Sequence, residues 1–89
     1  MRGLTQIVGK TIEAVVVKES HEPPRFQVFL IFSDRTHFEF WCHNEEIAAN
    51  QRVYEGGLET VRKYMKEESR KIIFEACRDK ANRIVVEKG

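Results

Sequence analysis

The segment FQVFLIF at residues 26–32 constrains the fold of this chain most, because nearly every position in it is apolar. Successive side chains of a strand point to opposite faces of a sheet. A strand that is apolar on both sides needs cover on both sides, from the rest of the chain or from a partner. One face of the segment carries Phe26, Val28, Leu30 and Phe32, and the other carries Phe29 and Ile31.

A hairpin is predicted directly after this segment. The turn-forming triplet SDR at residues 33–35 leads into a second strand, THFEFWCH, at residues 36–43. Trp41 is the only strongly apolar residue on one face of that strand. The other face carries Phe38, Phe40 and Cys42.

Further strands are predicted on either side of the hairpin. A β-branched run predicts a strand over residues 11–18, and the Pro-Pro pair that follows separates it from the hairpin. KIIFEAC at residues 71–77 is compatible with a strand or with continuation of a helix, and its Ile-Ile-Phe run favours the strand. A last strand is expected over residues 83–88, and residues 44–55 are expected to form a loop or a short helical turn.

One amphipathic helix is predicted over residues 57–69, after the pair Gly56-Gly57. Leu58, Val61 and Met65 recur at helical spacing, and opposite charges recur four residues apart. The sequence therefore predicts a single α+β domain over residues 1–89, an antiparallel sheet of three to five strands with this helix packed on one face. In that arrangement Ile72, Phe74 and Ala76 are expected to be buried beside the Phe38 and Phe40 face.

Composition excludes several classes of protein. Fifteen basic and fourteen acidic residues leave a net charge of +1, which gives no general attraction to nucleic acid or to an anionic membrane. No apolar stretch approaches the ~18 residues of a membrane span. The start of the chain lacks the pattern of a secretory signal, so a cytoplasmic location is expected, with Cys42 and Cys77 as buried, reduced thiols rather than a disulfide.

No catalytic or metal site is expected, and no cofactor. Cys42 and His43 are neighbours, but adjacent strand residues face opposite sides of a sheet, and His37 lies roughly 20 Å from His43 along an extended strand. The Gly pair before the helix lacks the spacing of a phosphate-binding loop. We therefore expect a protein that is not an enzyme.

A nucleic-acid-binding module is the alternative function that the sequence leaves open. Arg62, Lys63, Lys66 and Arg70 gather on one side of the predicted helix, where a basic stripe could follow a phosphate backbone. Aromatic strand residues could then stack bases. Acidic residues interrupt this stripe, and a solvated helix face accounts for it more simply.

The favoured function is a small protein-interaction or regulatory accessory domain, acting as a homodimer or as a partner-bound subunit. One helix covers one face of a sheet, and the predicted helix is assigned to the Phe38 and Phe40 face. The apolar residues Phe29, Ile31 and Trp41 would then lie on the uncovered face. Exposed aromatic and aliphatic patches mark interaction sites, so these three residues are the predicted protein interface.

Overall fold

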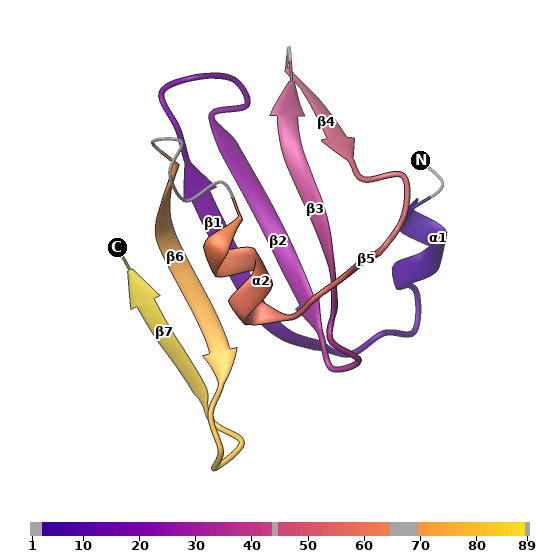
Figure 1. Ribbon diagram of the computed structural model, residues 1–89, viewed down its shortest axis with the longest axis vertical. Helices are drawn as coiled ribbons and strands as arrows, with labels where there is room; N and C mark the ends of the chain where they lie inside the picture. The colour runs from indigo at the N-terminus through magenta and orange to yellow at the C-terminus, as the bar shows by residue number, and fades with distance from the viewer. Residues whose placement is uncertain (1–2, 44, 65–69, 89) are drawn as a thin grey trace.

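Three adjacent strands form the centre of one antiparallel sheet: β1 (Ile12–Glu19), β2 (Phe26–Phe32) and β3 (Thr36–His43) (Figure 1). The predicted bounds of β2 and β3 are confirmed. The turn between them is tight because Arg35 adopts a φ of 64° and donates its backbone N–H to the carbonyl of Phe32 at 3.1 Å.

The computed structural model describes residues 3–43, 45–64 and 70–88 of the chain. In that part the sheet has seven strands, in the order β4-β3-β2-β1-β6-β7 with β5 beside β3 (Figure 1). The α+β class is confirmed, whereas the expectation of three to five strands was too low. The four outer strands are β4 (Glu46–Ala49), β5 (Tyr54–Glu55), β6 (Lys71–Arg78) and β7 (Ile84–Lys88).

The segments that the sequence left open form strands. Residues 71–77 belong to β6, which pairs with β1 from Lys71 to Cys77, so the strand prediction is confirmed there. The expected loop or helical turn at residues 44–55 was wrong for residues 46–49 and 54–55, which form β4 and β5 and pair with β3, whereas residues 50–53 between them are loop. Backbone pairing along the edge of β3 forms these short strands without a long apolar pattern of their own.

Among the described residues two short helices flank the sheet: α1 (Gly3–Ile7), which the sequence analysis did not predict, and α2 (Leu58–Lys63). The predicted helix was longer, and its positions 65–69 lie outside the described residues. Within the described part α2 ends at Lys63, because Tyr64 has extended backbone angles.

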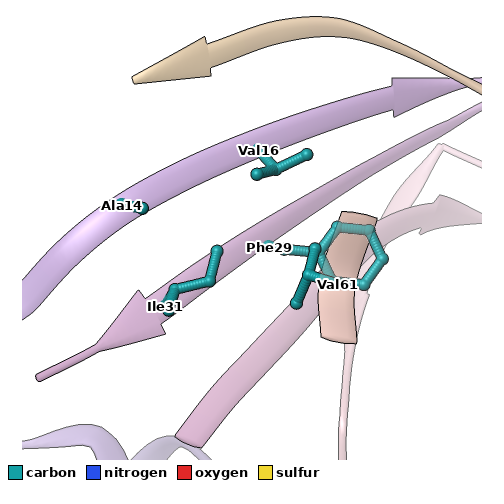
Figure 2. Packing of buried hydrophobic residues seen from close by; sticks show 5 residues of the cluster. All are labelled: Ala14, Val16, Phe29, Ile31 and Val61. Carbon is teal, nitrogen blue, oxygen red and sulfur yellow. The ribbon is translucent and has the colours of Figure 1, made fainter. Parts of the chain in front are cut away.

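The helix α2 packs on the face of the sheet that carries Phe29 and Ile31, which we call the inner face (Figure 2). Val61 of α2 is fully buried against Phe29 of β2, whose side chain is 1% exposed. The prediction that the helix covers the Phe38 and Phe40 face was therefore wrong. Beneath α2 the buried cluster consists of Ala14, Val16, Phe29, Ile31 and Val61 (Figure 2).

A bulge in β6 decides which of its side chains reach the helix. Val17 of β1 is opposite Phe74, but the next residue, Lys18, is opposite Ile72, so β6 holds one residue more than its partner. Ile72 consequently packs with the inner cluster, while Phe74 and Ala76 lie on the same side as Phe38. Phe74 and Ala76 are only half-buried there, contrary to the expectation of a core position.

Candidate functional site

The opposite side of the sheet, which we call the outer face, is apolar across its four central strands. Strand pairing places half-buried aliphatic and aromatic side chains from β1, β2, β3 and β6 next to one another. None of these positions carries a charge. The outer face consists of Val15, Val17, Val28, Leu30, Phe40, Phe74 and Ala76.

The helix α1 covers one corner of this face. Phe38 is fully buried, and its ring comes so close to Gly3 that a Cβ at this glycine would lie 2.5 Å from a ring carbon. Among the described residues no other helix lies over the outer face, because α2 packs on the inner one. Most of the outer face is therefore open to solvent or to a partner.

A hollow of about 350 Å³ adjoins the outer face near β4. Its walls are almost entirely apolar, and two of its side chains protrude strongly, with Phe26 43% exposed and Ile47 70% exposed. Such a concave apolar surface suits the insertion of a partner's aromatic or aliphatic side chain. The hollow is lined by Phe26, Val28, Phe40, Trp41, Cys42 and Ile47.

The three residues predicted as a protein interface do not form one surface. Phe29 and Ile31 are 1% and 3% exposed beneath α2, so they are part of the core of this chain. Trp41 is half-buried opposite Gln27, and it also lines the hollow beside the outer face. Only Trp41 among them lies where a partner could reach it.

Polar side chains on the inner face explain why the sequence pattern misassigned the two faces. Gln27 and Glu39 are buried there, and the Gln27 Nε2 donates to a Glu39 carboxylate oxygen at 2.7 Å. Arg70 donates to the other side of the Gln27 amide, at 3.0 Å. Polar side chains that hydrogen-bond to one another can be buried. The presence of Glu39 on one face of β3 therefore does not show that this face is exposed to solvent.

Lys18 completes this inner polar cluster. Its ammonium donates to the carbonyl of Tyr64 and lies 5.4 Å and 5.6 Å from the ring centres of Phe29 and Tyr64. Burial lowers the pKa of Lys18, although the carboxylate of Glu39 acts in the opposite direction. Burial likewise raises the pKa of Glu39, against the hydrogen bond from Gln27. In both groups the loss of water on burial outweighs the attraction of the opposite charges nearby.

The basic residues proposed for nucleic-acid contact are largely engaged within the chain. Arg62 makes two hydrogen bonds to the carboxylate of Glu75 and one to Glu59. Arg70 donates to the Pro24 carbonyl at 2.8 Å as well as to Gln27. Lys63 is exposed, and Lys66 lies outside the described residues. No observation favours the nucleic-acid hypothesis over the protein-interaction one.

The residues considered for metal or thiol chemistry are dispersed. Within residues 3–43, 45–64 and 70–88, no group of three or more His, Cys, Asp or Glu side chains could hold a metal ion. Cys42 and Cys77 are both free thiols, but Cys42 is exposed and Cys77 is half-buried, so the expectation of two buried thiols was wrong. The ring of His37 contacts the carbonyl oxygen of Gly56 through Nδ1 at 2.9 Å, which ties β3 to the start of α2.

Comparison of the chain with protein-family models, with curated proteins and with solved structures gives no match. No helix in the described part of the chain is long and apolar enough to cross a membrane.

Proposed function

We propose that this chain is a non-catalytic protein-interaction domain and that its partner at the outer face is a second copy of itself. The observation that carries the proposal is the outer face, which is apolar at every central position and which the described residues cover at one corner alone, through α1. Monomeric soluble domains rarely leave such a surface in water.

The side of the molecule that carries the outer face is broad enough for a stable interface. The molecule measures 39 × 31 × 20 Å, so its broad side exceeds the ~800 Å² that each partner of a standard interface buries. Each Val, Leu or Phe that becomes fully buried contributes roughly 1.5–3 kcal/mol. Half-buried side chains gain only part of that, yet seven of them on one face still provide a substantial driving force.

A second copy suits this surface because a two-fold contact brings the same patch of both molecules together. The outer face has no charged side chain at its central positions, so two copies can approach without burying like charges. Twisted sheets of the same hand stack face to face about 10 Å apart, with side chains interleaved. Trp41 and the apolar hollow would lie at the margin of this contact.

Light scattering coupled to size-exclusion chromatography tests the proposal with two outer-face variants, Val17→Glu and Phe40→Glu. Each places a charge on a half-buried outer position without touching the inner core, so circular dichroism should remain native while the mass falls by a factor of two. Ser33→Glu adds the same charge in an exposed turn and should leave the mass unchanged.

A natural chain that is monomeric at about 100 µM would refute self-association, since a standard apolar interface gives tighter binding. A larger assembly whose mass is the same in both Glu variants as in the natural chain would instead exclude the outer face.

A further inference from the structure

The strand β7 is an edge strand with unusually exposed aliphatic side chains. It ends the strand order in the described sheet, and all five of its residues are exposed. Ile84, Val85 and Val86 are 72%, 41% and 51% exposed. An exposed, apolar edge of this kind is a template for another strand unless charge, proline or a bulge protects it.

The backbone of β7 presents hydrogen-bonding groups away from the sheet at every second residue. Asp79 donates its N–H to the carbonyl of Arg83 at 2.8 Å, which fixes the side of β7 that faces β6. By alternation along an antiparallel ladder, Val85 and Glu87 also direct their backbone groups to β6. Ile84 and Val86 therefore direct their N–H and C=O groups outward.

We propose that β7 pairs antiparallel with β7 of a second copy, in the register centred on Val85. Ile84 is then opposite Val86 of the other copy, and these residues exchange backbone hydrogen bonds on both sides of the two-fold axis. Their side chains meet on the outer side of the sheet. On the inner side, Arg83 is opposite Glu87 of the other copy, which gives two ion pairs across the axis.

This register is selected by charge complementarity. Centring the pair on Val86 would place Glu87 opposite Val85 and Lys88 opposite Ile84. Centring it on Glu87 would bring two carboxylates together, which is destabilising for directly opposed residues. Only the register on Val85 matches aliphatic with aliphatic and basic with acidic.

The residues needed for these ion pairs are available. The side chain of Arg83 is 79% exposed, and its contact with Asp79 in the same chain is long, at 3.6 Å. Glu87 is exposed on the inner side of β7, opposite Glu75 of β6, whose carboxylate is held by Arg62. An exposed carboxylate next to a second acidic residue gains from a basic partner.

Pairing at β7 is independent of stacking at the outer face. Edge pairing relates two copies by an axis perpendicular to the sheet and leaves both outer faces on the same side. Outer-face stacking, as proposed above, uses an axis parallel to the sheet. With both contacts present, and with their axes crossing, four copies form a closed assembly of the kind common among soluble proteins.

Val86→Pro tests the edge contact, with Val86→Thr as its matched control. Proline removes an N–H that points away from β6, so the intrachain ladder is kept and edge pairing is lost. We expect light scattering to give half the natural mass for Val86→Pro, with a native circular dichroism spectrum. Threonine keeps the N–H and the branched shape, and its mass should equal that of the natural chain.

A charge exchange tests the register. Arg83→Glu and Glu87→Arg should each weaken edge pairing about tenfold, because each replaces two opposite-charge pairs across the axis by two like-charge pairs. The double variant restores opposite charges at both sites and should recover the natural mass. A double variant that is no better than either single one would overturn the register.

The two proposals predict different mass patterns. If both hold, the natural chain is a tetramer, and Val86→Pro and Phe40→Glu each give a dimer. If only the edge pairs, the natural chain is a dimer that Val86→Pro converts to monomer and Phe40→Glu does not affect. If Val86→Pro folds and keeps the natural mass, the edge contact is refuted whatever the outer face does.

Discussion

Truncation of one aromatic residue on each face of the sheet tests which face α2 covers. Phe29 is 1% exposed, packs against Val61, and meets the ring of Tyr64 edge to face at 5.9 Å. Phe74 is half-buried on the outer face, where no helix of the described chain covers it. Truncating either phenylalanine to alanine therefore removes the same volume, but from very different surroundings.

The Phe29→Ala change is expected to lower the free energy of unfolding by about 3–5 kcal/mol, as for a large-to-small change in a core. Edge-to-face contact with Tyr64 places the value toward the upper end. Phe74→Ala is expected to cost about 1–2 kcal/mol in the monomer, because part of its surface is already in water. Phe29→Leu, at about 1 kcal/mol, provides a variant that stays folded if the domain is only marginally stable.

Urea denaturation followed by circular dichroism, at several protein concentrations, measures both costs. The cost of Phe29→Ala should not depend on concentration, since the contacts lie within one chain. The cost of Phe74→Ala should grow with concentration if the outer face is an interface. A dilute-solution cost for Phe74→Ala that equals or exceeds that of Phe29→Ala would refute the assignment of the faces.

Two further changes test the charges of the inner face. Arg62→Gln should lower the free energy of unfolding, measured by urea denaturation, by about 1–3 kcal/mol, because it leaves the nearly buried Glu75 without its partner. The control Lys63→Gln, at an exposed neighbouring position, should change this free energy by no more than about 0.5 kcal/mol. Equal costs for the two variants would contradict a structural role for the Arg62–Glu75 pair. Burial raises the pKa of Glu39 above its ordinary 4.5, so the folded chain binds the proton more tightly and loses stability as the pH rises through that raised pKa. Glu39→Gln removes this titration, so the free energy of unfolding of the variant, relative to that of the natural chain, should increase from about pH 4.5 to pH 7. Parallel urea denaturation of the two proteins across this range measures the difference. A difference that stays constant or decreases would show that burial does not disfavour the charged form of Glu39.

The local elements were predictable, whereas the choice of faces was not. The first and last residues of β2 and β3 follow from the alternation of apolar and polar side chains and from the turn between the strands. Both signals depend only on residues that are close in sequence. The face that α2 covers depends on partners distant in sequence. Gln27 with Glu39, and Arg62 with Glu75, bury polar groups by pairing them, and a pattern of single residues counts each of these groups as exposed.

The candidate surface was missed for the same reason. The sequence did indicate this surface, because β1 is apolar on both sides and Phe74 lies beside it. The outer face was nevertheless taken for the core, because the helix was assigned to the wrong face of the sheet. Of the predicted interface residues, Trp41 alone lies near the open surface, at its margin. The short strands β4 and β5 have no alternating apolar pattern in the sequence, because they form through backbone pairing with β3.

The bulge in β6 makes the fold sensitive to single-residue changes in length. The bulge places one additional β6 residue opposite Val17 and Lys18, and this residue sets which face of the sheet each earlier β6 side chain points to. Loss of that residue in a descendant sequence would turn Ile72 away from the inner cluster and carry Arg70 away from Gln27. Homologous sequences should therefore keep the spacing between Arg70 and Phe74 even where the side chains between them vary.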